Sequence, residues 1–276
     1  MKSIAVLMTC HNRLELTLNC INALFKNSNL NNIKLDVFLV DDGSTDGTSD
    51  AIKNNYPEVN LIHGDGNLYW NRGMHLAFKT AMEIDFDGYL WLNDDTVLFP
   101  NAIDELLKTC LADNETIVVG AICDSQTKEY TYGGARYIDP IFRPFLCKIV
   151  VPNGEPQEVD VMNGNVVLIP NSIANKLGNL DPVFEHGMGD TDYSMRARKL
   201  GITILTTPSF IGTCSVNPTQ GTYQDKNISL YKRLKQLFSK KGQPWRSWLV
   251  MCWRHGGWLW PIHFIWCYIK IIIGRS

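Results

Sequence analysis

The sequence has no run of about 20 apolar residues, the length that a membrane-spanning helix needs. Its nearest candidate, 258–273, is shorter and is interrupted by Pro261, His263 and Lys270. The N-terminal residues 1–8 enter a strand-like run directly, without the apolar core and cleavage site of a secretory signal peptide. We therefore expect neither a membrane-spanning helix nor a signal peptide.

The cysteines lack the paired spacing of a metal site or a disulfide framework. None of the eight forms a Cys-x-x-Cys motif. Most lie in apolar runs, namely Cys20, Cys110, Cys123, Cys252 and Cys267. We interpret them as small core residues of a protein in a reducing compartment. Internal repeats and low-complexity segments are also absent.

Acidic residues are nearly absent from the C-terminal part. Residues 225–276 hold ten Lys and Arg, one acid (Asp225) and six of the eight Trp. This tail carries +9, so the rest must carry −11 to give the overall −2. A basic, Trp-rich segment favours an interfacial anchor on an anionic membrane. The alternative is a helical pair that packs on the rest of the chain or on a second subunit.

The chain of 276 residues, 45% of them hydrophobic, can form one large domain with or without a short appendage. Its first half alternates strand-like apolar runs with apolar residues at helical spacing. The expected strands are 4–9, 37–40, 59–62, 89–92 and 117–121. The expected helices cover 14–25, Ala51–Ile52, 74–81 and a segment with Pro100 in its first turn. This alternation favours an α/β fold with a mostly parallel sheet covered on both faces.

The second half is less regular. Glycines and prolines between 133 and 152 indicate a loop-rich or hairpin region. A strand at 166–169, a helix at 190–200 and a last core strand at 202–205 are expected to follow.

Polar sequences follow all four of the first strands. They are Thr9-Cys10-His11-Asn12-Arg13, Asp41–Thr48, Gly64-Asp65-Gly66-Asn67 and Asn93-Asp94-Asp95. In open α/β sheets ligands bind beyond the carboxyl ends of the strands. We therefore expect a ligand site where these four segments meet.

Adjacent acids at two strand ends indicate a site that binds a cation or a polar ligand. Neighbouring carboxylates such as Asp94 and Asp95 repel one another unless a cation or hydrogen bonds compensate. A hard divalent cation would do so and would also bridge diphosphate oxygens. Alternatively, both acids cap the following turn. Asp41 and Asp42 have two interpretations of their own: they form a turn, or one carboxylate accepts hydrogen bonds from a pyrimidine N–H or from ribose hydroxyls.

Three segments together, Thr9–Arg13, Val40–Thr48 and Asn93–Asp95, resemble glycosyltransferase family 2. Gly64–Met74 and Asp160–Asn165 resemble its subgroup of rhamnosyltransferase-like enzymes of bacterial polysaccharide synthesis. The resemblance covers roughly residues 1–215. It implies a GT-A fold, which is Rossmann-like with a mostly parallel central sheet and flanking helices. It also implies an inverting sugar transfer from a nucleotide sugar.

The resemblance implies roles for the strand-end residues. Asn93-Asp94-Asp95 stands where the family has its DXD motif, so Asp95 would hold Mg²⁺ or Mn²⁺ against the diphosphate. This chain departs from the motif with Asn93, a neutral oxygen ligand. Nucleotide and donor sugar would be bound by Thr9, His11, Asn12, Arg13, Asp41, Asp42, Gly66, Asn67, Trp70, Arg72, Asn93 and Asp94. Arg72 would suit a diphosphate, whereas Trp70 could equally be a core aromatic residue.

The catalytic base is expected before the helix at 190–200. An inverting transfer needs one carboxylate to deprotonate the acceptor hydroxyl. By resemblance to the acidic segment of the family, Asp190 matches the base, although Gly189 replaces the usual Glu. Glu185 and Asp192 are the alternatives.

Asp190 and Asp192 also have structural interpretations. Asp190 could cap the helix, and Asp192 could pair with Arg196 four residues later. A carboxylate at a helix N-terminus has its pKa lowered by the helix dipole, which would keep Asp190 ionised.

Many members of the family have a late His that helps to bind the metal or phosphate. The matching region here, 208–215, contains none. Either His186 serves as this ligand or the metal has fewer protein ligands. Alternatively, His186 lies in a solvent-facing loop and has no role in the site. Asn163, Glu185, His186 and Asp192 are candidates to support the acceptor.

We expect a GT-A domain at 1–220, with a nucleotide-binding half at 1–125 and an acceptor-binding and catalytic half at 126–220, followed by the helical tail 221–276. The predicted activity is transfer of a hexose or deoxyhexose from a UDP- or dTDP-sugar to a glycan, carried on a lipid such as a polyprenyl diphosphate. The tail would attach this cytoplasmic enzyme to the inner face of the membrane. The chain could also form a homo-oligomer, and no nucleic acid partner is expected.

Two other classes remain as alternatives. A nucleotidyltransferase usually carries a Gly-rich phosphate loop near its N-terminus, and Thr9–Arg13 has no glycine. A non-catalytic nucleotide-sugar-binding scaffold would explain Asn93, Gly189 and the missing late His. The retention of both Asp95 and Asp190 argues against such a decayed site.

Overall fold

The computed structural model describes residues 3–27, 33–110 and 115–273. Its centre is a mixed sheet in the order β10-β13-β6-β12-β4-β1-β2-β3. The strands of this path are β1 (Ser3–Cys10), β2 (Lys34–Asp41), β3 (Asn60–His63), β4 (Gly88–Leu92), β6 (Thr116–Cys123), β10 (Gln157–Glu158), β12 (Val166–Pro170) and β13 (Thr203–Thr213). Two short strands, β5 (Val97–Leu98) and β7 (Tyr130–Tyr132), pair with β13 and β6.

The central strands are mostly parallel, as the sequence predicts. β4, β1, β2 and β3 run parallel to one another, and β13 runs parallel to β6. β12 lies antiparallel between β4 and β6 and so joins the two parallel groups. The predicted last strand is longer than expected, because β13 continues to Thr213 through an irregularity in its register with β6.

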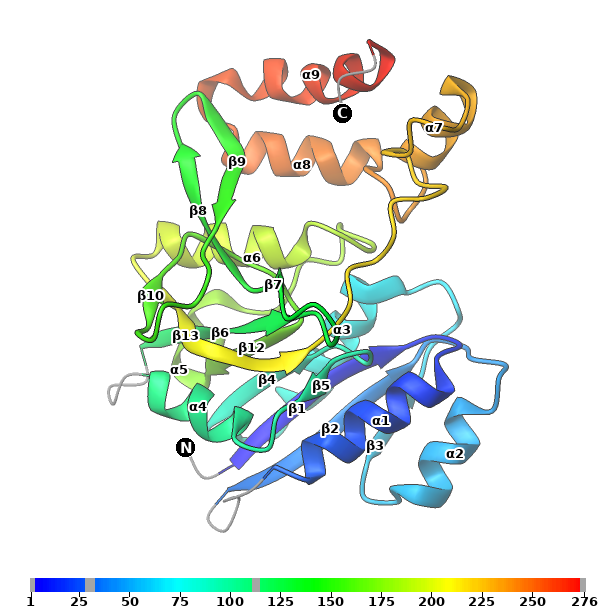
Figure 1. Ribbon diagram of the computed structural model, residues 1–276, viewed down its shortest axis with the longest axis vertical. Helices are drawn as coiled ribbons and strands as arrows, with labels where there is room; N and C mark the ends of the chain where they lie inside the picture. The colour runs from blue at the N-terminus through cyan, green and yellow to red at the C-terminus, as the bar shows by residue number, and fades with distance from the viewer. Residues whose placement is uncertain (1–2, 28–32, 111–114, 274–276) are drawn as a thin grey trace.

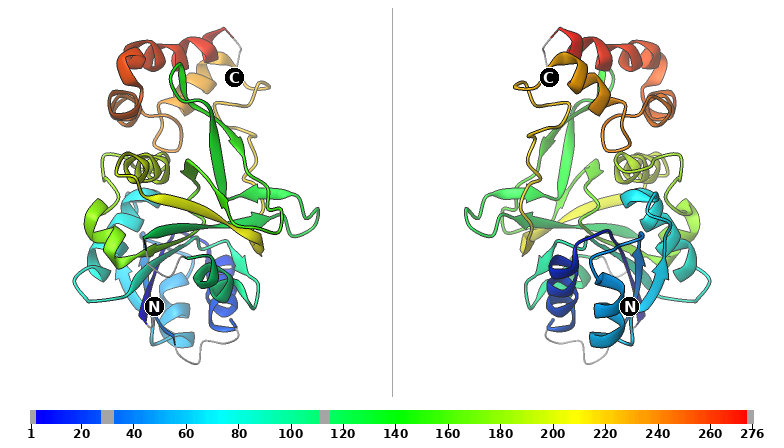
Figure 2. Two further views of the ribbon diagram at one scale, coloured as in Figure 1. Left: turned by 90° about the vertical axis from the view of Figure 1, so that its left-hand side faces the viewer. Right: turned by 90° about the vertical axis from the view of Figure 1, so that its right-hand side faces the viewer.

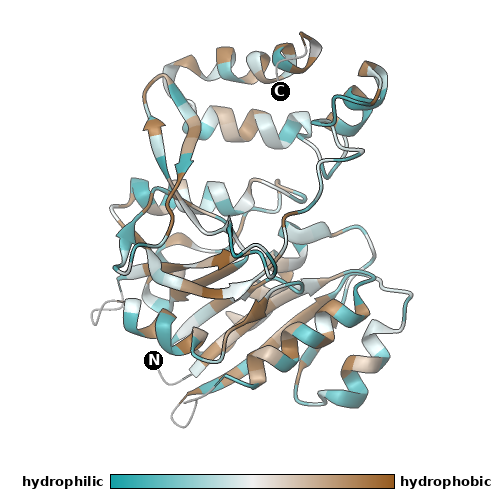
Figure 3. Ribbon diagram, in the orientation of Figure 1, coloured by the Kyte–Doolittle hydropathy of each residue, from teal (hydrophilic) through white to brown (hydrophobic). Residues whose placement is uncertain are grey.

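Helices cover both faces of this sheet, and the strands are accordingly apolar on both sides (Figure 3). In β1, Ala5 and Leu7 pack in one core, whereas Ile4, Val6 and Met8 pack in the other. The first core is closed by α3 (Tyr69–Ala81), α5 (Asn171–Leu177) and α6 (Gly189–Lys199), and the second by α1 (Leu14–Phe25), α2 (Thr48–Asn55) and α4 (Ala102–Thr109). Pro100 precedes α4 rather than lying in its first turn, since the helix begins at Ala102 after Asn101.

The predicted hairpin region forms a second, small sheet. Its strands are β8 (Gly134–Asp139), β9 (Arg143–Ile149) and β11 (Val161–Met162), in the order β11-β8-β9. The β8–β9 hairpin rises from the main sheet towards the C-terminal helices (Figures 1 and 2).

The tail is helical, as expected, and consists of α7 (Leu230–Leu237), α8 (Trp245–His255), a short 3₁₀ turn (Gly257–Leu259) and α9 (Trp260–Ile272). α8 packs on the domain through Trp248, Met251 and Cys252, which bury against Phe184 and Met195. α9 lies against the outer side of α8 (Figure 1). The tail thus packs on its own chain along one face. No described helix has the length and apolarity needed to cross a membrane.

A buried carboxylate fastens α8 to the domain. The Asp192 side chain on α6 is fully buried and bonds Arg196 at 2.8 Å, Arg254 at 3.2 Å and His255 at 2.9 Å. Burial alone would raise its pKa, but the His255 hydrogen bond and the Arg196 and Arg254 charges hold the pKa below its usual value. The predicted pair with Arg196 is confirmed. Because three cationic or hydrogen-bonding groups surround Asp192, it serves the fold and is not placed to act as a base.

Replacing Asp192 by Asn should destabilise the protein by about 3 kcal/mol, because Arg196, Arg254 and His255 would lose the buried carboxylate that they share. Urea unfolding measures this change. Asp36→Asn is the control, since Asp36 pairs with the exposed Lys34 and such pairs contribute about 0–1 kcal/mol. Equal losses in both variants would contradict a fastening role for Asp192.

Candidate active site

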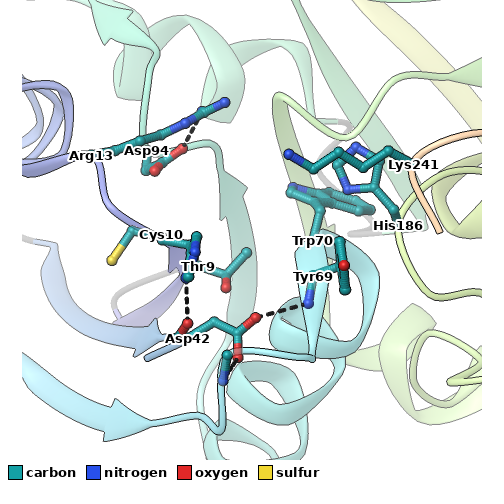
Figure 4. Close-up of a pocket in the computed structure, with 11 residues that line it drawn as sticks. Thr9, Cys10, Arg13, Asp42, Tyr69, Trp70, Asp94, His186 and Lys241 are labelled. Carbon is teal, nitrogen blue, oxygen red and sulfur yellow. Dashed lines mark hydrogen bonds and ion pairs between the residues drawn. The ribbon is translucent and has the colours of Figure 1, made fainter. Parts of the chain in front are cut away.

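The carboxyl ends of β1, β2 and β4 and the first turns of α3 and α6 surround a cleft. It consists of two adjoining cavities of about 240 and 200 Å³. Both are lined by Arg13, Trp70, Asp94 and His186, so they lie next to each other. Figure 4 shows the first cavity. Its place beyond the strand ends is the one that the sequence predicts.

Most of the predicted site residues line this cleft. The first cavity gathers Thr9, His11, Arg13, Asp42, Gly66, Trp70, Asp94 and His186. The second gathers Arg13, Trp70, Asn93, Asp94, Asp95, Asn163, His186 and Asp190. Six predicted residues line neither cavity: Asn12, Asp41, Asn67, Arg72, Glu185 and Asp192.

Asp42 organises the loop that borders the first cavity. Its carboxylate accepts hydrogen bonds from the backbone N–H groups of Gly66 at 2.8 Å, Leu68 at 2.9 Å and Tyr69 at 2.9 Å. His11 donates from Nδ1 to the Asp42 carbonyl at 2.5 Å. The carboxylate therefore fixes the start of α3 while it faces the cavity.

Residues beside the cleft hold the strand-end loops. The Asp41 carboxylate accepts from the Ser44 N–H at 2.9 Å and from the Ser49 hydroxyl. The Asn12 side chain accepts from the Thr45 N–H at 2.7 Å and so ties the end of β1 to the loop after β2. Neither side chain lines a cavity, and each has a structural role in this arrangement.

The two acids after β4, Asp94 and Asp95, share the guanidinium of Arg13. Arg13 Nη1 lies 3.0 Å from Asp94 Oδ1 and 2.7 Å from Asp95 Oδ2. Asp94 is only 5% exposed, and its Oδ2 has no hydrogen-bond partner among the described residues. Burial raises the pKa of Asp94 to about 7; the charge of Arg13 opposes this shift, and that of Asp95 adds to it. The pair therefore has a deficit of positive charge.

This deficit fits a divalent cation held jointly with a ligand. Among the described residues, no three His, Cys, Asp or Glu form a preformed metal cage. Mg²⁺ beside a nucleotide is usually held by one or two carboxylates together with phosphate oxygens. Asp95 and the unpartnered oxygen of Asp94 match that donor set.

Asn93 is not free to act as the neutral metal ligand that the sequence suggests. Its Oδ1 accepts from Trp70 Nε1 at 2.6 Å, and its Nδ2 donates to Asn165 Oδ1 at 2.9 Å. The amide thus connects the aromatic wall of the cleft to the loop before β12. With Asn93 engaged in this way, the carboxylates of Asp94 and Asp95 are left as the ligands.

Trp70 combines the two roles that the sequence leaves open. It lines both cavities, and its ring also packs edge-on against the buried Trp91 at 6.3 Å. Gly164 allows this position, because a Cβ there would come within 2.4 Å of the Trp70 ring. Trp70 is therefore a core aromatic residue whose exposed side forms the wall between the two cavities.

Asp190 faces the second cavity from the first turn of α6. Its Oδ2 accepts from the Gly164 N–H at 3.0 Å, and its Oδ1 accepts from the Thr191 N–H at 2.8 Å. The expectation that the helix dipole lowers its pKa is wrong. Burial raises the pKa of Asp190 and outweighs the hydrogen bonds that lower it. A raised pKa makes this carboxylate more basic than an exposed one.

His186 lies in the cleft rather than in a solvent-facing loop. It lines both cavities, and its Nδ1 is buried without a hydrogen-bond partner among the described residues. Burial, with the nearby charges of Lys241 and Arg13, lowers its pKa to about 4. The imidazole is therefore neutral near pH 7.

The segment 208–215, where many family members have a late His, instead places the Cys214 thiol beside the acid pair. Cys214 Sγ lies 3.5 Å from Asp95 Oδ1 and lines the second cavity. Other lining residues that sequence reasoning did not select are Cys10, Tyr69, Tyr132, Gly164, Asn165, Gly187, Asn217 and Lys241. Cys10, Tyr69, Gly164 and Asn165 lie inside segments already identified as motifs, so adjacency could have found them. No sequence signal indicates Lys241.

Comparison with known proteins gives one family and one fold. The family described as Glycosyl transferase family 2 matches residues 5–165. Two curated relatives from strains of Mycobacterium tuberculosis, both named N-acetylglucosaminyl-diphospho-decaprenol L-rhamnosyltransferase, are 25% identical over 197 residues. The match covers 63% of this chain and 64% of the relatives, so the chain spans slightly less than two thirds of their length.

Two solved structures share the fold. GalNAc-T7 with UDP, GalNAc and Mn²⁺ has a TM-score of 0.62 at 15% identity, over 80% of this chain and 44% of that one. The mannosyltransferase PcManGT from Pyrobaculum calidifontis with GDP-Man and Mn²⁺ has a TM-score of 0.54 at 16% identity. This match covers 87% of this chain and 62% of that one. At these identities the likeness shows the fold alone, and both neighbours are glycosyltransferases.

The raised pKa of Asp94 gives stability a pH dependence. Folded Asp94 keeps its proton up to about pH 7, whereas an unfolded Asp loses it near about 3.9. Between these values unfolding releases a proton, so stability should fall as pH rises. Asp94→Asn should flatten this fall in melting temperature, measured without divalent cations. The control Glu83→Gln changes an exposed acid; an unchanged slope in Asp94→Asn would contradict the burial argument.

Proposed function

The chain belongs to glycosyl transferase family 2, and we propose that it transfers a hexose or deoxyhexose from a UDP- or dTDP-sugar to a glycan acceptor with inversion at the anomeric carbon. The observation that carries this proposal is that an undercompensated acid pair and a separate carboxylate, that of Asp190, line the same cleft. Asp94 lines both cavities of this cleft, and Asp95 and Asp190 both line the second.

The first cavity would hold the nucleotide. Thr9, His11 and Asp42 line this cavity, which Asp95 does not line, and a base and ribose would lie beside them. The diphosphate would lie beside Asp94 and Asp95, with Arg13 close enough to contact its oxygens. Mg²⁺ or Mn²⁺ held on these carboxylates would neutralise charge that develops on the leaving diphosphate. The two structural neighbours, solved with UDP and with GDP-Man, support a nucleotide-sugar donor.

Asp190 would act as the base. Two backbone N–H groups hold its carboxylate at the second cavity, where an acceptor hydroxyl can approach. The hydroxyl oxygen attacks the anomeric carbon while its proton passes to Asp190, and the bond between carbon and diphosphate oxygen breaks with its electron pair on the diphosphate. Glu185 is less suited, because it pairs with Arg72 at 3.1 Å and lines neither cavity.

The acceptor would be a lipid-linked glycan of bacterial surface polysaccharide synthesis. The curated relatives are named for a decaprenyl-diphosphate-linked acceptor. The tail would dock on the inner face of the cytoplasmic membrane, because it exposes Trp253, Trp258 and Trp266 and also the basic Arg246 and Lys270. This surface would bring the active site to a lipid-linked substrate.

Binding and turnover test the active-site assignment. We expect the melting temperature to rise with UDP- or dTDP-sugars in the presence of Mn²⁺, because ligands that bind the native state stabilise it. Asp190→Asn should keep this shift but lose about 100-fold or more in kcat. The matched control Asp65→Asn changes an exposed strand-end acid outside the cleft. Binding without turnover in the wild type would favour the scaffold class instead.

The pH profile gives an independent check of the base. Because burial raises the pKa of Asp190, kcat should increase with pH through a midpoint above the usual Asp value of about 3.9. A profile without an acidic limb above that value would contradict Asp190 as the base.

Membrane docking is tested by sedimentation with vesicles. Replacing Trp258 and Trp266 together by Ser should weaken binding to phosphatidylglycerol vesicles by about tenfold or more, because buried aromatic area supplies the affinity. Neutral phosphatidylcholine vesicles should bind less, since the tail is basic. The control Leu200→Ser removes an exposed apolar side chain on the domain. Equal binding of the Trp variant and wild type would contradict the docking role.

A further inference from the structure

The turn that follows α7 reaches back to the first cavity. Lys241 lines this cavity together with residues of the strand ends, which lie more than 140 residues earlier in the chain. In Figure 4 its side chain lies beside His186 and Trp70, across the cavity from Arg13. A part of the basic tail is thus a wall of the candidate donor site.

This turn has a defined conformation. Gly242 donates to the Ser239 carbonyl at 2.9 Å, and Gln243 donates to the Leu237 carbonyl at 2.6 Å. A Cβ on Gly242 would come within 2.2 Å of the Gln236 carbonyl oxygen, so the turn closes tightly on the end of α7 only with glycine there. The backbone next to Lys241 is therefore held by hydrogen bonds and steric contact.

Neighbouring side chains fasten the turn to the domain. The Lys240 ammonium lies 4.9 Å from the ring centroid of Tyr69 and 3.9 Å from Glu185. Glu185 in turn pairs with Arg72 at 3.1 Å. Arg72 and Glu185, which line neither cavity, thus connect α3 to the tail. Lys240 is engaged in docking, whereas Lys241 is directed at the cavity.

Lys241 is the uncompensated cation of the cleft. No hydrogen bond or ion pair of its side chain occurs within the described part of the chain, and the residue is exposed. Arg13 is shared between two carboxylates, and the neutral His186 leaves its buried Nδ1 unpartnered. An anion bound between Arg13 and Lys241 would meet positive charge from both sides.

We infer that Lys241 binds the diphosphate of the donor, so that the C-terminal tail completes the nucleotide-sugar site. This inference rests on the proposed function, because it concerns the donor of that reaction. An ammonium on a flexible stem is a point charge well suited to phosphate oxygens. The position of Lys241 beside Trp70 and His186, away from Asp42, places it at the phosphate end of the cavity rather than at the base.

Calorimetric titration of the full chain with UDP and dTDP, and with UMP and dTMP, in Mn²⁺ tests this role. Lys241→Met keeps the length of the side chain and removes its charge. We expect about a tenfold loss of affinity for whichever diphosphate the wild type binds, and a smaller loss for the monophosphate of the same base. Lys241→Arg should restore most of the affinity. Lys235→Met, on the exposed face of α7, is the matched control.

Three outcomes would overturn the inference. Unchanged diphosphate affinity in Lys241→Met, beside a wild type that binds, refutes the role of Lys241 and leaves the proposed function standing. Equal losses in Lys241→Met and Lys235→Met would show a general effect of tail charge and would also refute it. A wild type that binds none of the four nucleotides refutes the proposed function and this inference with it.

Discussion

Charge compensation at the end of β4 is the constraint on which the rest of the site depends. Asp94 and Asp95 lie side by side at the end of a buried strand, and one guanidinium, that of Arg13, serves both. A single positive charge cannot balance two carboxylates at low dielectric, so one acid keeps an unpartnered oxygen and a raised pKa. The same deficit would favour a bound divalent cation, which in the proposed function would link these carboxylates to diphosphate oxygens.

Hydrogen bonds relate this acid pair to the proposed base. Asn93 joins the acid segment to Trp70 and Asn165, and the Gly164 N–H holds Asp190. The loop before β12 therefore contacts both chemical centres of the cleft. Because each amide and carboxylate in this chain of contacts has a fixed partner, the two cavities are organised relative to each other before any ligand arrives. Such preorganisation is what transfer between two bound substrates requires.

The tail is fastened to the domain at two places with different chemistry. Asp192 holds α8 through a buried network, and the Glu185–Lys240 contact holds the turn after α7 over the cleft. Both places use acids that the sequence offered as alternative bases. Their partners explain why each is better suited to docking than to proton transfer. The tail also exposes tryptophan, so the proposed membrane contact would use side chains other than those that pack on the domain.

The sequence by itself determined the α/β order, the family and the place of the cleft, because apolar periodicity sets strands and helices and parallel strands gather their carboxyl ends at one edge. Spacing along the chain could not decide which strand-end polar groups face the ligand. Thus Asp42 lines the cavity whereas Asp41 holds a turn. Only the tertiary structure showed that burial raises the pKa of Asp190, and that Cys214 and Lys241 reach the cleft. Desolvation and long-range proximity arise from packing between distant segments, which no local pattern records.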